Sequence, residues 1–423
     1  MSRWFLIVAC LFVPFSTVVA ERLPEASWPQ WRGPHNTGGV DDGNYPSQLD
    51  PATNLIWKTK LPGAGFSTPI IWKQQIILTS PADGKDALFL LNWNGALQWT
   101  LTLGPERPGK HQNGSGSNPS PITDGNLIFA YYKSGTLAAA NFDGQLLWQT
   151  NLQQRFSDDT LWWDLGTSPV VTKNAVIIAV MQEADAYLAA FEKRSGKLLW
   201  KVPRTYETPV EGDHSYATPI VITQDGKELI VVWGAEHLTA HDAANGKIIW
   251  SCGGFNPDEN RNWVVVASHA IAEGIAVVPY GRGAHIAGIR LGKTGDITRT
   301  HRLWTSDGTG AFVPTPAISG GKIYSVRDEG EVECLDLQTG KTLWSNRFPK
   351  HRKKYYASPI VAGGKLFAPR EDGTVLVASI HDGLTLLSEN VLGEQIIASP
   401  VAVSNRLFIR GAKHLYCFSE NGD

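Results

Sequence analysis

The fold is decided by one stretch of the chain, Cys334-Leu335-Asp336-Leu337-Gln338-Thr339-Gly340-Lys341-Thr342-Leu343-Trp344. It reads as an apolar strand, a turn at Thr-Gly-Lys and a second strand that ends in tryptophan. Related stretches recur about every 40 to 55 residues. Each keeps a small residue, a glycine and a tryptophan in one register: Ala138, Gly144 and Trp148; Ala190, Gly196 and Trp200; Ala240, Gly246 and Trp250. A fixed period of this size indicates an array of repeated structural units.

A second mark, Ser or Thr followed by Pro, falls between the tryptophans. It occurs at Pro69, Pro121, Pro169, Pro219, Pro316, Pro359 and Pro400. Midway between Pro219 and Pro316, Ser268-His269 takes its place, which brings the number of units to eight. Proline suits the first residue of an innermost strand, where a missing N–H costs little.

Each unit reads as four short strands separated by Gly- and Asp-containing turns, as residues 315–344 show best. Strands do not alternate with helical segments, which argues against a parallel sheet. Four-stranded antiparallel units of this length are blades of a β-propeller. The sequence therefore predicts an all-β, eight-bladed β-propeller. We expect the recurring tryptophans to pack between neighbouring blades: Trp57, Trp99, Trp148, Trp200, Trp250, Trp304 and Trp344.

The last blade is one strand short, because the chain stops after Leu415-Tyr416-Cys417-Phe418 and a final turn. Residues 54–58, Asn-Leu-Ile-Trp-Lys, match a fourth strand but precede the first Ser/Thr-Pro mark. We predict that this segment pairs with the last blade and closes the ring, which removes the exposed edges of an open array.

Three segments are predicted from the N-terminus onward. Residues 1–20 have the charge, apolar run and small-residue end of a signal peptide, which predicts a secreted or periplasmic protein; lipid attachment at Cys10 is the alternative. Residues 21–53, with Trp28-Pro29-Gln30-Trp31-Arg32, are expected to cap the propeller, which spans 54–423. The formal net charge of −2 gives no reason to expect a nucleic-acid partner, and the remaining cysteines show no metal or haem spacing. A monomer without a transmembrane segment is expected.

The repeat with a small residue, Asp, Thr-Gly-Lys and a closing Trp, as in Cys334 to Trp344, resembles the pyrroloquinoline-quinone (PQQ)-type propeller repeat, which is found in the quinoprotein dehydrogenases. The repeats are also similar to the BamB family of propeller lipoproteins that assist outer-membrane protein assembly. The preface Trp28-Pro29-Gln30-Trp31-Arg32-Gly33-Pro34, followed by a Leu-x-Trp strand and the first Ser/Thr-Pro mark, resembles that of secreted propellers of planctomycete-type bacteria. The quinoprotein resemblance makes PQQ with calcium a possible cofactor pair. However, the adjacent Cys-Cys pair of the alcohol dehydrogenases and a CxxCH haem site are both absent from this sequence. We therefore expect no cofactor and no metal site.

Two sets of loops should meet at one mouth of the central channel, namely those entering each first strand and those joining the second and third strands. The second set carries cations in one register, Arg327, Arg370 and Arg410, with Lys133 and Arg282 at equivalent positions. The entering loops add Trp163, His214, Tyr216 and Tyr356. One interpretation is a rim that binds an anionic or polyhydroxylated ligand. The alternative is that the arginines pair with neighbouring acids such as Asp328, Glu371 and Asp372, or cap the channel.

No nucleophile or oxyanion motif accompanies these residues, so no catalytic residue is assigned. The first functional hypothesis is a non-enzymatic binding or protein-assembly scaffold of the cell envelope, with an envelope protein or a small polar ligand as partner. The second is a PQQ-dependent periplasmic oxidoreductase acting on alcohols or sugars. The third is a polysaccharide-acting enzyme that uses the central funnel.

Overall fold

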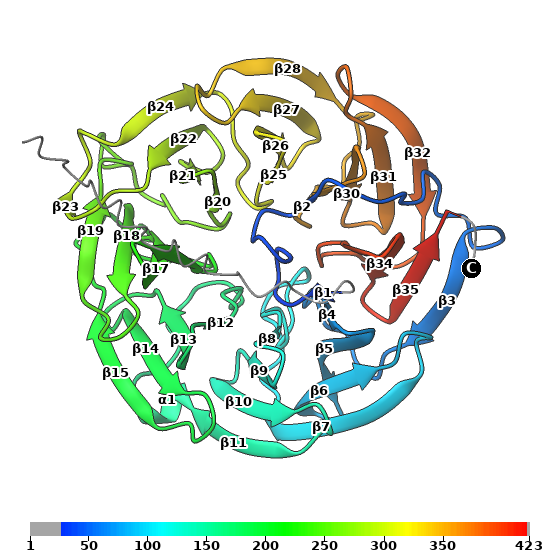
Figure 1. Ribbon diagram of the computed structural model, residues 1–423, viewed down its shortest axis with the longest axis horizontal. Helices are drawn as coiled ribbons and strands as arrows, with labels where there is room; N and C mark the ends of the chain where they lie inside the picture. Colours follow the sequence, from blue (N-terminus) through cyan, green and yellow to red (C-terminus); the bar gives the residue numbers. More distant parts are fainter. Residues whose placement is uncertain (1–26, 421–423) are drawn as a thin grey trace, which may run out of the picture.

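The computed structural model describes residues 27–420, and the predicted signal peptide at 1–20 and Cys10 lie outside the described residues. The strands form eight antiparallel sheets arranged in a ring around a central axis (Figure 1). The predicted eight-bladed propeller is therefore confirmed, including the fifth blade, which begins after Ser268. No helix in the described part of the chain is long and apolar enough to cross a membrane.

The first four blades follow one another along the chain. Blade 1 contains β4 (Ile70–Trp72), β5 (Gln75–Ala82), β6 (Lys85–Leu91) and β7 (Leu97–Pro105). Blade 2 contains β8 (Ile122–Thr123), β9 (Leu127–Tyr131), β10 (Thr136–Asn141) and β11 (Leu146–Asn151), followed by the short α1 (Leu152–Arg155). Blade 3 contains β12 (Val170–Val171), β13 (Ala175–Val180), β14 (Tyr187–Glu192) and β15 (Leu198–Pro203). Blade 4 contains β16 (Ile220–Gln224), β17 (Lys227–Gly234), β18 (His237–Asp242) and β19 (Ile248–Cys252).

The other four blades complete the ring. Blade 5 contains β20 (Ala270–Ala272), β21 (Ile275–Tyr280), β22 (His285–Arg290) and β24 (Arg302–Asp307). Blade 6 contains β25 (Ala317–Ser319), β26 (Lys322–Val326), β27 (Glu331–Asp336) and β28 (Thr342–Arg347). Blade 7 contains β29 (Ile360–Ala362), β30 (Lys365–Pro369), β31 (Thr374–Ser379) and β32 (Thr385–Val391). Blade 8 contains β33 (Val401–Val403), β34 (Arg406–Arg410), β35 (His414–Ser419) and β3 (Leu55–Lys60).

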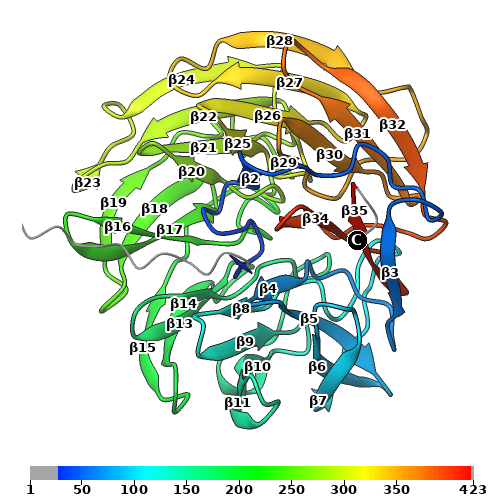
Figure 2. The same ribbon diagram turned by 45° about the vertical axis from the view of Figure 1, so that its right-hand side comes forward.

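The ring closes between the two ends of the chain, as predicted. Strand β3 is antiparallel to β35, with Trp57 opposite Cys417 and Thr59 opposite Leu415. Figures 1 and 2 both show β3, near the start of the described chain, beside β35 at its end. This pairing leaves β35 with a hydrogen-bonded neighbour on each side, so the third strand of the last blade is not an exposed edge.

The tryptophan and glycine of the repeat meet across blade boundaries. Gly340 has a φ of +67°, and a Cβ there would lie 2.3 Å from Cδ2 of Trp304 in the preceding blade. Only glycine allows both this backbone conformation and this close approach. The indole N–H groups of five tryptophans donate to carbonyl oxygens of the next blade at 2.9–3.1 Å, namely Trp57, Trp99, Trp148, Trp200 and Trp304.

Two tryptophans depart from this pattern. Trp250 is fully buried, and the inserted β23 (Gly295–Asp296) runs parallel to β19 beside it. Its indole N–H has no hydrogen-bond partner among the described residues. Trp344 packs against Tyr324 within its own blade, and a Cβ on Gly383 of the next blade would meet nothing within 4 Å. The repeat is therefore looser at the junction of blades 6 and 7.

Residues 27–53 run across the inner strands rather than forming a separate unit. Strand β1 (Ser27–Trp28) adds to the inner strand of blade 1, and β2 (Gly39–Val40) runs parallel to the inner strand of blade 7. Between them, the buried Arg32 donates to the carbonyl oxygens of Pro316 and Pro359 at 3.2 and 2.9 Å. Trp31 donates to the Ser399 hydroxyl at the start of the inner strand of blade 8 at 3.3 Å. This segment thus fills part of the central channel.

Candidate binding funnel

The Ser/Thr residues of the repeated mark form a hydroxyl ring at the start of the inner strands. Its members are Thr68, Ser120, Ser168, Thr218, Ser268, Thr315, Ser358 and Ser399. At seven of the eight boundaries, a backbone N–H of one member donates to the hydroxyl oxygen of another at 2.9–3.1 Å. Ser268 belongs to this ring even though no proline follows it. The proline of the mark suits the start of the inner strand, whereas the hydroxyl group, which Ser268 also has, joins the blades.

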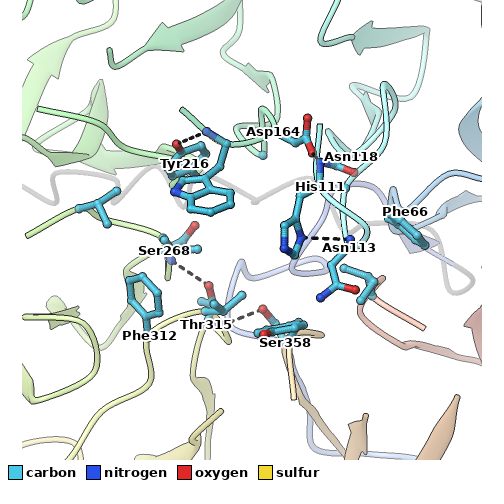
Figure 3. Close-up of a pocket in the computed structure, with 18 of the residues that line it drawn as sticks. Phe66, His111, Asn113, Asn118, Asp164, Tyr216, Ser268, Phe312, Thr315 and Ser358 are labelled. Atoms are coloured by element: carbon cyan, nitrogen blue, oxygen red, sulfur yellow. Dashed lines mark hydrogen bonds between the residues drawn. The ribbon is translucent and has the colours of Figure 1, made fainter. Parts of the chain in front are cut away.

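A cavity of about 890 Å³ opens above this ring on the face that carries the two predicted sets of loops. We call it the funnel. Its floor is formed by seven members of the hydroxyl ring together with Trp31. Its wall carries aromatic rings from five different entering loops: Phe66, Trp162, Trp163, Tyr216, Phe312 and Tyr356. Figure 3 shows labelled side chains from several blades converging on this space. A volume of this size falls within the range of about 300–1,000 Å³ that small-molecule sites occupy.

The predicted aromatic residues divide between the funnel wall and the layer behind it. Trp163, Tyr216 and Tyr356 line the funnel, and the Tyr216 hydroxyl accepts from the Trp163 backbone N–H at 3.1 Å. Burial raises the pKa of the Tyr216 phenol, so it stays protonated. His214 does not line the funnel. It is buried and stacks edge-on against Trp162 at 5.4 Å between ring centroids.

Most of the predicted cationic rim is corrected by the structure. Arg370 is buried and paired with Asp372 at 3.0 Å, as the alternative interpretation expected. Arg410 is fully buried and donates to Ser67, because its side chain turns into the boundary between blades 8 and 1. Arg327 donates to the Gly308 carbonyl at 2.7 Å and does not line the funnel. Only Arg282 reaches the wall, where its guanidinium lies 4.2 Å from the Phe312 ring centroid.

Lys133 is buried behind the wall and forms an ion pair with Asp164. Asp164 also accepts from the backbone N–H groups of Lys110 and His111 at 2.7 and 2.9 Å. One carboxylate therefore joins two entering loops, which bring His111 and Trp163 into edge-on contact at 5.5 Å. The sequence contained this acid in the run Trp162-Trp163-Asp164, but its partner lies 31 residues away in the preceding blade.

The funnel wall is close to electrically neutral. Its acids are Asp164, Glu211 and Asp328, and its arginines are Arg261 and Arg282. Asp164 is already compensated by Lys133. Asp328 accepts from the backbone N–H groups of Phe312 and Val313, each at 3.2 Å, and burial raises its pKa. Glu211 accepts from the indole N–H of Trp163 at 3.3 Å. Sequence reasoning missed Glu211 and Arg261 because no repeat register marks them.

A second buried acid gives the protein a pH-dependent stability. The Asp86 side chain in β6 is fully buried and accepts from the Ser134 hydroxyl, and its other oxygen has no hydrogen-bond partner within residues 27–420. Burial raises the pKa of this carboxyl to about 7, and the Ser134 hydrogen bond opposes the rise. As the pH rises, the unfolded chain, in which Asp86 has an ordinary pKa near 4, therefore loses this proton at a lower pH than the folded protein does.

The sign of the effect follows from this difference. Stability from Asp86 is complete below about pH 4 and is lost as the pH rises through about 7. Urea denaturation should show Asp86→Asn gaining up to about 4 kcal/mol relative to the unmodified protein between pH 4 and pH 8. Asp185→Asn, at an exposed position, serves as the control. A constant difference between Asp86→Asn and the unmodified protein across this range would contradict the assignment.

The fold and the funnel define the class of protein: an eight-bladed propeller with an aromatic-lined cavity on its loop face. A model of the family described as outer membrane protein assembly factor BamB matches residues 47–184, 150–296 and 293–401. The chain belongs to this family. It is 25% identical over 237 residues to the outer membrane protein assembly factor BamB of Yersinia pestis, covering 54% of this chain and 56% of that protein. It is also 37% identical over 59 residues to BamB of Alkalilimnicola ehrlichii, covering 13% and 15% of the two chains.

The chain thus spans little more than half of the first of these relatives, and less than two thirds of either. Solved structures extend the likeness of fold. The crystal structure of BamB from Moraxella catarrhalis superposes with a TM-score of 0.61 at 14% identity, covering 87% of this chain and 99% of that one. A europium-containing methanol dehydrogenase gives 0.71 at 12% identity, covering 94% and 98%. The quinohemoprotein alcohol dehydrogenase of Comamonas testosteroni gives 0.69 at 13%, covering 94% and 81%. At such low sequence identities, these TM-scores show a shared fold alone.

The funnel residues do not fit the quinone of the dehydrogenases. A tricarboxylate needs several cations, but the two arginines of the wall stand among three acids, and Arg370 and Arg410 are buried away from the cavity. Within residues 27–420, no three His, Cys, Asp or Glu side chains group to hold a metal ion. The three cysteines of this range are buried in strands and do not line the funnel.

Proposed function

We propose that this protein is a non-catalytic binding and assembly scaffold of the cell envelope, and that the loop face around the funnel is its binding face. The observation that carries the proposal is the wall itself, which is lined by aromatic side chains from five entering loops. Trp162 and Trp163 are 49% and 51% exposed, whereas the tryptophans between blades are half-buried or buried. Exposed aromatic clusters of this kind mark interaction sites. Membership in a family described by outer-membrane protein assembly supports an envelope protein as partner.

The scaffold proposal is tested by placing a photo-crosslinking amino acid at Tyr356 in the funnel wall. The matched control carries the same group at Leu199, which is 46% exposed on an outer strand. Illumination of the full chain in envelope extract should yield a discrete crosslinked envelope protein from position 356 and none from position 199. Equal products from both positions, or none from position 356, would remove the funnel face as the binding face.

The oxidoreductase alternative is tested with the purified protein, pyrroloquinoline quinone and calcium. We expect neither a bound quinone chromophore after gel filtration nor dye-linked oxidation of alcohols or sugars, because the wall does not offer the cations that a tricarboxylate requires. A stoichiometric chromophore that supports turnover would overturn the non-catalytic assignment.

A further inference from the structure

We infer that the funnel binds a neutral oligosaccharide through stacking on Trp162 and Trp163, an inference that rests on the funnel face being the binding face. The two indoles are adjacent, and neighbours hold both of them. Trp162 contacts His214 edge-on at 5.4 Å, and Trp163 contacts His111 at 5.5 Å and donates to Glu211. About half of each side chain stays exposed despite these contacts. Aromatic rings held at their places are suited to stacking because little rotamer freedom is lost on binding.

The polar groups of the funnel complement hydroxyls more than charges. The amides of Asn113, Asn118 and Asn262 line the wall. Asn113 is held by Glu371 and Gln395, and the Asn118 oxygen accepts from Ser115, so the remaining amide N–H and lone-pair positions are the donors and acceptors left for a ligand. In the floor, the hydroxyl oxygens of the ring accept backbone N–H groups. Within residues 27–420, no acceptor takes the hydroxyl protons of the floor residues Ser120, Ser168, Ser268, Thr315 and Ser358. These protons remain available to a ligand oxygen.

Charge balance excludes strongly ionic occupants. An acidic ligand would meet Glu211 and Asp328, and a basic ligand would meet Arg261 and Arg282. A sugar ring has apolar C–H faces bordered by hydroxyls, which matches aromatic faces on the wall and mixed donors and acceptors around them. A neutral oligosaccharide therefore satisfies the wall and the floor together.

Isothermal titration calorimetry with malto-, cello- and N-acetylglucosamine oligomers tests this inference. We expect at least one series to bind with an affinity that changes little between 50 and 500 mM salt, since neutral ligands are not screened. Trp162→Ala and Trp163→Ala should each weaken binding by about tenfold or more, as loss of an aromatic contact does. Leu199→Ala, a half-exposed apolar residue on an outer strand, should leave the affinity unchanged.

Thermal unfolding of each variant establishes that the fold is retained, and Trp163→Phe, which keeps an aromatic face, should preserve most of the affinity. The inference would be overturned if no oligosaccharide series bound. It would also be overturned if the folded double variant Trp162→Ala/Trp163→Ala kept full affinity. Binding confined to acidic saccharides with steep salt dependence would also overturn it. If oligosaccharides fail while crosslinking at position 356 still captures an envelope protein, the proposed function stands and only the ligand class falls.

Discussion

Lys133→Met should lower the free energy of unfolding by about 3–5 kcal/mol, the cost of leaving a buried charge without its partner. Lys133 is 1% exposed, and its ammonium group contacts Asp164 and the Pro108 carbonyl, the latter at 2.8 Å. The variant keeps Asp164 buried beside the hydrogen-bonded backbone of Lys110 and His111 but removes the ammonium group with which its carboxylate is paired. Urea denaturation at neutral pH measures the loss.

Two further variants separate the ion pair from general effects of the substitution. Lys201→Met removes an exposed cation 3.2 Å from Asp185 and should change stability by less than about 1 kcal/mol. Lys133→Met combined with Asp164→Asn should recover part of the loss because the uncompensated charge is gone. A loss below about 1 kcal/mol in Lys133→Met alone would show that Asp164 is neutral or solvated in the folded protein.

Trp57→Ala should destabilise the protein by about 3 kcal/mol, at the low end for truncation of a packed tryptophan because Trp57 is half-buried. Its ring packs against Phe408 of blade 8 at 5.9 Å, and its indole N–H donates to the Trp93 carbonyl of blade 1 at 3.0 Å. The side chain thus ties the closing strand to the blades on both sides of the seam.

The matched control for this seam is Trp162→Ala, which removes a tryptophan of the same size from an exposed loop. We expect it to cost less than about 1 kcal/mol in the same urea titration. If the two variants lost equal stability, the closing strand would contribute nothing beyond its general apolar surface, and the account of ring closure would be wrong.

The fold was predictable because its information is local and repeated. The blades repeat the same strand alternation and turn glycines, and seven of the eight carry the outer-strand tryptophan, so many copies of a weak signal reinforce one another. The closing of the ring could also be predicted. Blade 8, at the C-terminal end, lacks a fourth strand, and residues 54–58, near the N-terminal end, match a fourth strand that belongs to no neighbouring blade. The looser junction at Trp344 was not predictable, because it depends on Gly383 in the next blade.

The funnel was only partly predictable. The two loop sets that line it follow from the direction of the strands, so Trp163, Tyr216, Tyr356 and Arg282 were found at the right face. Repeat register, however, fixes a residue's height along the axis and not the direction of its side chain. Arg370 and Arg410 lie at places roughly equivalent to that of Arg282, but Arg370 pairs with Asp372 in its own turn and Arg410 turns into the boundary between blades 8 and 1 to reach Ser67.

By itself, the sequence determined the number of blades, the strand that closes the ring and the face on which the loops gather. All three follow from the regular spacing of the Ser/Thr-Pro and Gly/Trp marks. The tertiary structure alone decided which charges remain free, since Lys133 meets Asp164 and Arg32 meets Pro359 across separations that no periodicity marks. It also decided that the funnel is neutral and aromatic rather than cationic. Buried charges must find partners wherever the fold places them, and here those partners come from other blades and from the N-terminal segment.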